Sequence, residues 1–200
     1  MKTALVLLAA FLSTTAFAPA TGYEVGSKAT DFKLKNVDDK EVSLADFKEA
    51  KGFIVVFTCN HCPFSKKYEN RLIALDKRFK RQGYPVIAIN PNDEVSHPED
   101  SFEKMKERAK EKGFTFPYLR DESQQIATTY GAAKTPHVYI LKKEGADLVV
   151  KYIGAIDDNS DNEKEVKEKY VESAVNNLLA GKEVSPSLTK AIGCGIKWKK

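Results

Sequence analysis

Phe53-Ile-Val-Val-Phe-Thr-Cys-Asn-His-Cys62-Pro-Phe-Ser-Lys-Lys67 is the stretch from which the rest of the chain can be interpreted. Its first five residues are apolar and mostly favour β-structure, which predicts a buried strand over 53–57. Two cysteines spaced Cys-x-x-Cys follow, Cys59 and Cys62. Beyond them apolar residues recur every three or four positions, as on one face of a helix; they are Tyr68, Leu72, Leu75 and Phe79. The cysteines therefore lie where a strand passes into a helix.

This position determines the chemistry expected of the cysteines. Unpaired backbone N–H groups and the helix dipole stabilise an anion near a helix N-terminus. We therefore expect the pKa of the Cys59 thiol to lie well below the value of about 8.5 of a free cysteine. As a thiolate, Cys59 would attack a disulfide, and Cys62, one turn further on, would resolve the mixed disulfide. An inert disulfide or half of a zinc site is the alternative, which the strand-to-helix setting disfavours.

Composition restricts the class of protein. The chain has 200 residues, of which 42% are hydrophobic and 30% charged, and this fits one globular domain with its own core. The net charge of +4 is spread along the chain. Because there is no basic stripe, we expect no nucleic-acid partner.

Residues 1–18 have the pattern of a secretory signal peptide. Lys2 provides a short basic start, residues 4–12 form an apolar run of nine, and Ala16-x-Ala18 is a small-residue cleavage pattern. Nine residues are too few to span a bilayer, which takes about twenty, so we expect no stable membrane insertion. The mature protein should be exported, periplasmic or secreted, where disulfides persist.

Strands and helices alternate along the rest of the chain, which predicts an α/β protein with a covered sheet. Pro98-Glu99-Asp100 should open an inserted helix, with its acids near the positive end. Asp121-x-x-Gln124 has the pattern of a capping box. The other expected elements are a hairpin over 29–44, a short helix near 44–47, strands at 84–89, 137–141 and 148–153, and a last helix over 163–179.

Thr135-Pro136 precedes a predicted strand. A proline in this place can mark a turn or a sheet edge. Since a Cys-x-x-Cys helix comes earlier in the same order of elements, a cis peptide beside the two thiols is the stronger prediction.

The order of these motifs resembles the thioredoxin superfamily, in its peroxiredoxin-like (redoxin, AhpC/TSA-like) branch. Four stretches are similar to the peroxiredoxin-like thioredoxin-family proteins of bacteria: 59–64, 88–92, 116–119 and 193–198. The resemblance implies a thioredoxin-like fold, a central mixed β-sheet flanked by helices with an N-terminal β-hairpin and an inserted helix. It implies a domain over 23–181 followed by a C-terminal tail over 182–200. This chain departs from the pattern at Lys134, where members often have a cysteine, and at Thr58, where thioredoxins themselves have Trp.

Together, the motif and the resemblance predict a thiol-disulfide oxidoreductase with Cys59 and Cys62 as catalytic residues and Thr135 and Pro136 in support. Its partners would be protein disulfides or dithiols and a redox partner protein, with no bound cofactor and no metal. The direction of electron flow stays open. A histidine before the second cysteine, here His61, is typical of oxidants, whereas the redoxin-like scaffold is typical of reductants.

The remaining histidines and the third cysteine each have two interpretations. His61 either favours the Cys59 thiolate through a nearby donor or is an ordinary surface residue. His97 and His137 stand alone in the sequence, which gives little reason for a functional role. Cys194 is either a third redox thiol or a small buried apolar residue.

Two other classes of function remain. In a thiol peroxidase, Cys62-Pro63 at the helix start would be the reactive site, and Cys194 could resolve its sulfenic acid. Against this, the position three residues before Cys62, where a peroxidase has Thr or Ser, is Cys59 itself. In a Cu(I)- or Zn(II)-binding module, the two cysteines would need His137 as a further ligand.

Overall fold

The computed structural model describes residues 22–200. The predicted signal peptide, residues 1–18, lies outside these described residues. Among the helices of 22–200, none combines the length and apolar character that crossing a membrane requires.

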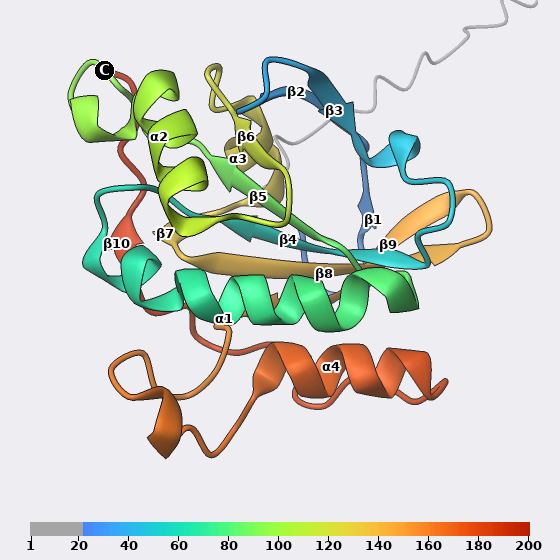
Figure 1. The fold of residues 1–200 in the computed structure, drawn as a ribbon. Coiled ribbons are helices and arrows are strands. Elements are labelled where there is room, and N and C mark those ends of the chain that lie inside the picture. The colour runs from blue at the N-terminus through green and yellow to red at the C-terminus, as the bar shows by residue number, and fades with distance from the viewer. Residues whose placement is uncertain (1–21) are drawn as a thin grey trace, which may run out of the picture.

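One mixed sheet of eight strands forms the centre of the molecule (Figure 1). Neighbours β4, β5 and β6 are parallel, and the other pairs are antiparallel. The strands, in order across the sheet, are β1 (Lys28–Ala29), β9 (Asp147–Gly154), β8 (His137–Glu144), β4 (Gly52–Phe57), β5 (Val86–Asn90), β6 (Tyr118–Arg120), β2 (Lys33–Asn36) and β3 (Glu41–Ser43).

Strand β4 lies in the middle of the sheet, and all of its six residues are buried. Because side chains alternate between the two faces of a strand, Ile54 and Val56 join one apolar cluster, and Phe53, Val55 and Phe57 join the other. Both faces must therefore be covered.

Helices cover both faces. Helices α1 and α4 lie side by side beneath the sheet in Figure 1, on the face of Ile54 and Val56, and Met105 of α2 packs into the same cluster. Ala127 and Tyr130 of α3 pack on the opposite face. The bounds are α1 Pro63–Phe79, α2 Phe102–Lys112, α3 Gln125–Tyr130 and α4 Tyr170–Leu179, with 3-10 helices η1 Leu44–Asp46, η2 Lys80–Gln82, η3 Pro98–Asp100 and η4 Glu163–Glu165. This arrangement confirms the predicted thioredoxin-like fold, with the β2–β3 hairpin and α2 as the inserted helix.

Local predictions are wrong at two places outside the active-site loop. The last helix does not run from 163 to 179, because the short η4 and the longer α4 are separated by non-helical residues. Asp121 and Gln124 do not form a capping box. Asp121 accepts the Ala127 N–H at 2.8 Å, while Gln124 takes a left-handed conformation (φ 61°) and turns its side chain towards the C-terminal tail.

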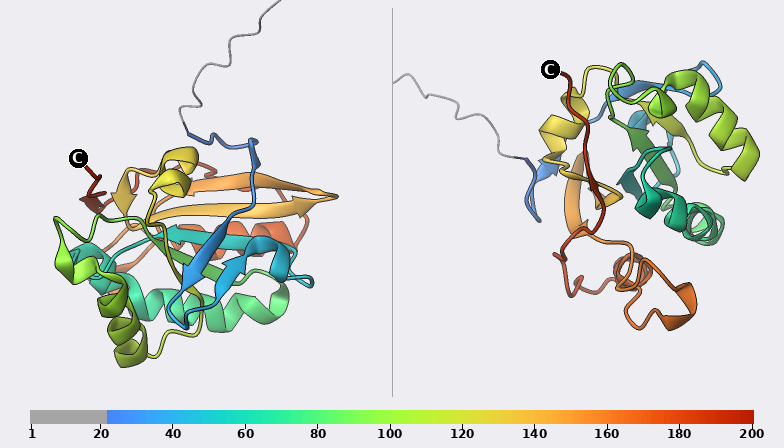
Figure 2. Two further views of the ribbon diagram at one scale, coloured as in Figure 1. Left: turned by 90° about the horizontal axis from the view of Figure 1, so that it is seen from above. Right: turned by 90° about the vertical axis from the view of Figure 1, so that its left-hand side faces the viewer.

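The C-terminal tail packs along the edge of the fold. Figure 2 shows it passing beside the sheet up to the C-terminus. Strand β10 (Cys194–Gly195) pairs antiparallel with β7 (Lys134–Thr135) in a separate two-stranded sheet, and the Ile196 side chain enters the core. The tail thus brings Cys194 beside Thr135, although the sequence shows no periodicity there.

Candidate active site

The Cys-x-x-Cys motif occupies the predicted junction. Helix α1 begins at Pro63 with Cys62 as its N-cap residue, and Cys59 precedes it in the loop after β4. Both side chains are buried, Cys59 with 3% of its surface exposed and Cys62 with none. The backbone N–H of Cys62 hydrogen-bonds the Cys59 sulfur and stabilises the Cys59 thiolate.

The Thr135-Pro136 peptide is cis, as predicted, and lies against both cysteines. The Thr135 hydroxyl is 3.3 Å from the Cys59 sulfur. The Thr135 carbonyl oxygen is 3.2 Å from the Cys62 sulfur. One residue of the predicted supporting pair thus contacts both predicted catalytic residues.

The third cysteine also belongs to this site. Cys194 forms a disulfide with Cys62, with Cα atoms 6.1 Å apart, and Cys59 is the free thiol. The expectation that Cys59 and Cys62 form the disulfide is therefore not met in this state of the molecule. The sequence could not show this pairing, because 132 positions separate Cys62 from Cys194.

The predicted pKa of Cys59 is wrong in direction. Burial raises the pKa of the Cys59 thiol above its ordinary value, and the negative charge of Asp100 raises it further. Hydrogen bonds from Thr135, the Cys62 N–H and Ser65 act in the opposite direction without reversing the shift. The helix-terminus argument fails because Cys62, not Cys59, caps α1, while Cys59 is enclosed by the protein.

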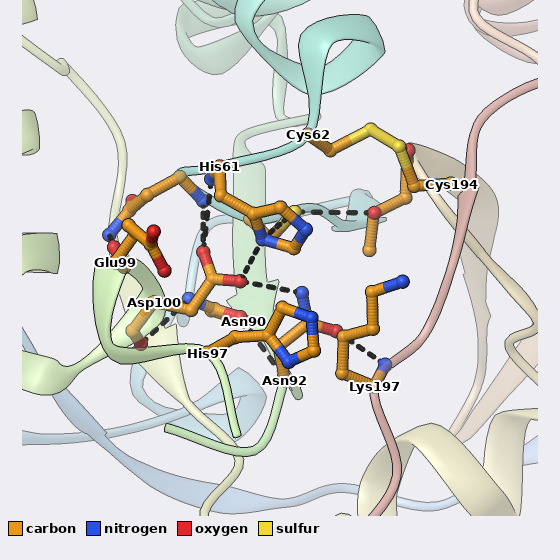
Figure 3. Close-up of polar contacts among 12 residues, drawn as sticks. His61, Cys62, Asn90, Asn92, His97, Glu99, Asp100, Cys194 and Lys197 are labelled. Atoms are coloured by element: carbon orange, nitrogen blue, oxygen red, sulfur yellow. Dashed lines mark hydrogen bonds and ion pairs between the residues drawn. A yellow bond between two sulfur atoms is a disulfide. The ribbon is translucent and has the colours of Figure 1, made fainter. Parts of the chain in front are cut away.

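His61 is paired with Asp100, a residue whose place in the sequence predicts a helix start and not a part of the site (Figure 3). Its Nδ1 lies 3.9 Å from the Cys59 sulfur and hydrogen-bonds the carboxylate of Asp100. Asp100 is completely buried and also accepts the backbone N–H groups of Asn60, at 2.7 Å, and of His61, at 3.1 Å. Asp100 thus fixes the conformation of the active-site loop.

A second missed residue connects this pair to the tail. Asn92 donates its side-chain N–H to Asp100 at 2.7 Å and accepts the Lys197 N–H at 2.9 Å, as Figure 3 shows. Asn92 lies in one of the family-like stretches, whereas the sequence predicts Asp100 in the first turn of the inserted helix. Instead it ends η3 and turns its side chain inward.

The two remaining histidines lie in different surroundings. The His97 ring packs on that of His61, with centroids 5.0 Å apart. His137 is in β8 against Tyr139, and burial lowers the pKa of its imidazole to about 4.

A metal site made of Cys59, Cys62 and His137 is not assembled in the described residues. The Cys62 sulfur is bonded to Cys194. The potential ligand atoms that do converge, within 4.8 Å of one another, belong to Cys59, His61 and Asp100. Because Asp100 is already bonded to four donors, this group is better described as a hydrogen-bonded network.

Comparison with known proteins identifies the family. The model of the AhpC/TSA family matches residues 25–153, more than half of the chain and both cysteines of the motif. The chain belongs to the AhpC/TSA family.

Similar proteins agree with this AhpC/TSA assignment. The thiol-disulfide oxidoreductase ResA of Geobacillus kaustophilus is 34% identical over 153 residues, covering 72% of this chain and 82% of ResA. The crystal structure of an uncharacterized conserved protein from the same organism has 40% identity and a TM-score of 0.81, over 88% of this chain and 93% of that one. A putative thiol:disulfide interchange protein from Chlorobium tepidum matches with 20% identity and a TM-score of 0.53, over 64% and 84%, which shows the fold alone.

Within this AhpC/TSA chain, the hydroxyl groups that could assist a reacting sulfur are placed around Cys59. Thr135 Oγ1 is 3.3 Å and Ser65 Oγ 3.9 Å from the Cys59 sulfur. The Thr or Ser that a peroxidase would place three residues before Cys62 is replaced by Cys59.

Proposed function

We propose that the protein is an exported thiol-disulfide oxidoreductase that acts on protein disulfides or dithiols through Cys59 and Cys62. The observation that carries this proposal is the Cys-x-x-Cys motif at the β4–α1 junction, with the cis Thr135-Pro136 peptide against both sulfurs. The similarity to ResA, which is named for this activity, supports it. Export rests on the signal-like sequence of residues 1–18.

Its mechanism is thiol-disulfide exchange. The Cys59 thiolate attacks one sulfur of a client disulfide, and the first client thiol leaves. Cys62 then attacks the Cys59 sulfur of the mixed disulfide, which releases the second client thiol and forms the Cys59–Cys62 disulfide. Contacts of Cys59 with the Thr135 hydroxyl and the Cys62 N–H stabilise the thiolate needed in the first step.

The test is reduction of insulin by the reduced protein. We expect Cys62→Ser to accumulate a mixed disulfide between insulin and Cys59, which peptide mass spectrometry would identify. Cys59→Ser should accumulate no mixed disulfide at position 59. If the reduced wild-type protein leaves insulin disulfides intact, the proposed function is incorrect. If Cys59→Ser reduces insulin as fast as wild type, Cys59 is not the attacking residue.

A thiol peroxidase is the second candidate, and the Cys62–Cys194 disulfide favours it, because this is the bond that would follow resolution of a Cys62 sulfenic acid. The hydroxyl groups around Cys59 rather than Cys62 are the argument against it. We expect the reduced protein to reduce insulin with a larger second-order rate constant than it consumes hydrogen peroxide. Fast peroxide turnover that disappears in Cys194→Ser would replace the oxidoreductase with a peroxidase.

A further inference from the structure

Three sulfurs, not two, converge on one residue of this site. Thr135 contacts Cys59 through its hydroxyl and Cys62 through its carbonyl oxygen, and it is the residue that Cys194 faces in the β7–β10 ladder. Cys194 is bonded to Cys62 while Cys59 stays reduced. The structure is therefore that of an oxidised protein in which Cys59 carries a free thiol.

The three cysteine residues differ in their exposure to solvent. Cys59 and Cys62 are at most 3% exposed, whereas Cys194 is partly exposed on the tail. Of the two bonded cysteines, Cys194 is therefore the one that a protein thiol can approach more readily from solvent.

The tail keeps Cys194 in place without help from the disulfide. Lys197 donates its N–H to Asn92 at 2.9 Å, and its carbonyl oxygen accepts from the Asp93 N–H at 2.8 Å and the Gln124 side chain at 2.7 Å. Ile196 is buried in the core. When the bond to Cys62 is broken, the Cys194 thiol thus remains next to Cys62.

We propose that Cys194 is a third catalytic cysteine, which takes the disulfide over from Cys59–Cys62 and presents it to the partner that re-reduces the protein. This inference rests on the proposed function and assigns its two reactions, with the client and with the recycling partner, to different cysteines. Clients react at Cys59, and the recycling dithiol protein reacts at Cys194.

The proposed cycle consists of thiol-disulfide exchanges in which each disulfide bond formed replaces one that is broken. After the client is reduced, the Cys194 thiolate attacks the Cys62 sulfur, so that the Cys62–Cys194 bond forms, the Cys59–Cys62 bond breaks, and Cys59 leaves as a thiolate that takes up a proton. A thiolate of the partner dithiol attacks the Cys194 sulfur and releases Cys62. The second partner thiol then closes the partner's own disulfide and releases Cys194. Overall, two electrons pass from the partner dithiol to the client disulfide.

The experiment compares two reactions of wild type and Cys194→Ser. In the first, the reduced protein reacts with insulin. In the second, the oxidised protein is re-reduced by a protein dithiol, for which reduced thioredoxin serves as the probe. We expect the ratio of the re-reduction rate to the insulin rate to fall at least tenfold in Cys194→Ser. Peptide mapping of oxidised wild type should find both disulfides, and Cys59→Ser, the matched control, only Cys62–Cys194.

The outcomes separate the two proposals. An unchanged ratio, or oxidised wild type that contains only the Cys59–Cys62 disulfide, would overturn the role of Cys194 and leave the oxidoreductase intact. Failure of reduced wild type to act on insulin would remove the proposed function itself.

Discussion

Gly193 precedes the tail cysteine and lies too close to the cis peptide for any side chain. A Cβ atom built on Gly193 would stand 2.3 Å from the Thr135 carbonyl oxygen, 2.7 Å from its carbonyl carbon and 3.0 Å from the Pro136 nitrogen. All three are backbone atoms of the same peptide, which cannot rotate away. In Gly193→Ala the tail must therefore move.

The size of the movement follows from these distances. Ordinary contact begins at 3.4 Å, so the Cβ must retreat by about 1.1 Å (3.4 minus 2.3 Å). Such overpacking costs typically about 1–3 kcal/mol. The displaced residue is next to Cys194, which pairs with Thr135, so the cost opposes the position of Cys194 that the disulfide requires. We therefore expect the equilibrium constant for Cys62–Cys194 disulfide formation to fall about 5- to 150-fold.

Gly195 offers a matched control in the same short strand. A Cβ on Gly195 meets nothing within 4 Å, and so Gly195→Ala should leave this equilibrium unchanged. The assay equilibrates each variant, in a Cys59→Ser background, with glutathione redox buffers and quantifies the disulfide by mass spectrometry after acid quenching. Equal constants for the two alanine variants would show that close packing against the cis peptide does not position Cys194.

Two further predictions concern charge. Asp100→Asn removes the carboxylate that raises the pKa of Cys59, so this pKa should fall and the pH-dependent exchange rate should reach its plateau at lower pH. The matched control is Glu99→Gln, a variant of the exposed neighbouring residue, which should not shift the ultraviolet titration of the Cys59 thiolate. An equal shift in both variants would contradict the effect assigned to Asp100. Burial lowers the pKa of His137 to about 4 from 6.5, so the unfolded state binds more protons between these values and the free energy of unfolding should decline as pH falls through that window. His137→Gln should flatten this decline in urea titrations carried out at a series of pH values, whereas identical pH profiles for wild type and His137→Gln would refute the role of His137.

Local patterns predicted the parts of the site that local forces determine. The alternation of β4 and the helical period of α1 depend on which faces are buried, and both can be read from residues close in sequence. The cysteine motif and the cis peptide followed from their places in the order of elements. Other features of the site depend on packing between distant residues: the direction of the Cys59 pKa shift requires knowledge of its burial and of Asp100.

The packing of the tail and the burial of Asp100 could not be predicted from the sequence, for the same reason. The tail is held by single hydrogen bonds to Asn92 and Gln124 and by one buried side chain, Ile196, none of which produces a repeating pattern. Asp100 is a charged residue in a helix-opening sequence, and hydrophobic periodicity assigns such residues to the surface. Its burial is possible because four donors compensate the carboxylate.

The distance in sequence between Cys62 and Cys194 links the position of the disulfide to the stability of the protein. A bond across 132 positions restricts the unfolded chain strongly, which by loop-closure entropy stabilises the fold by about 5 kcal/mol, whereas one across the Cys59–Cys62 loop contributes about 2 kcal/mol. Moving the disulfide from Cys59–Cys62 to Cys62–Cys194 therefore raises the free energy of unfolding by about 3 kcal/mol, although the core is untouched. Each passage of electrons through the tail would make the protein alternately harder and easier to unfold.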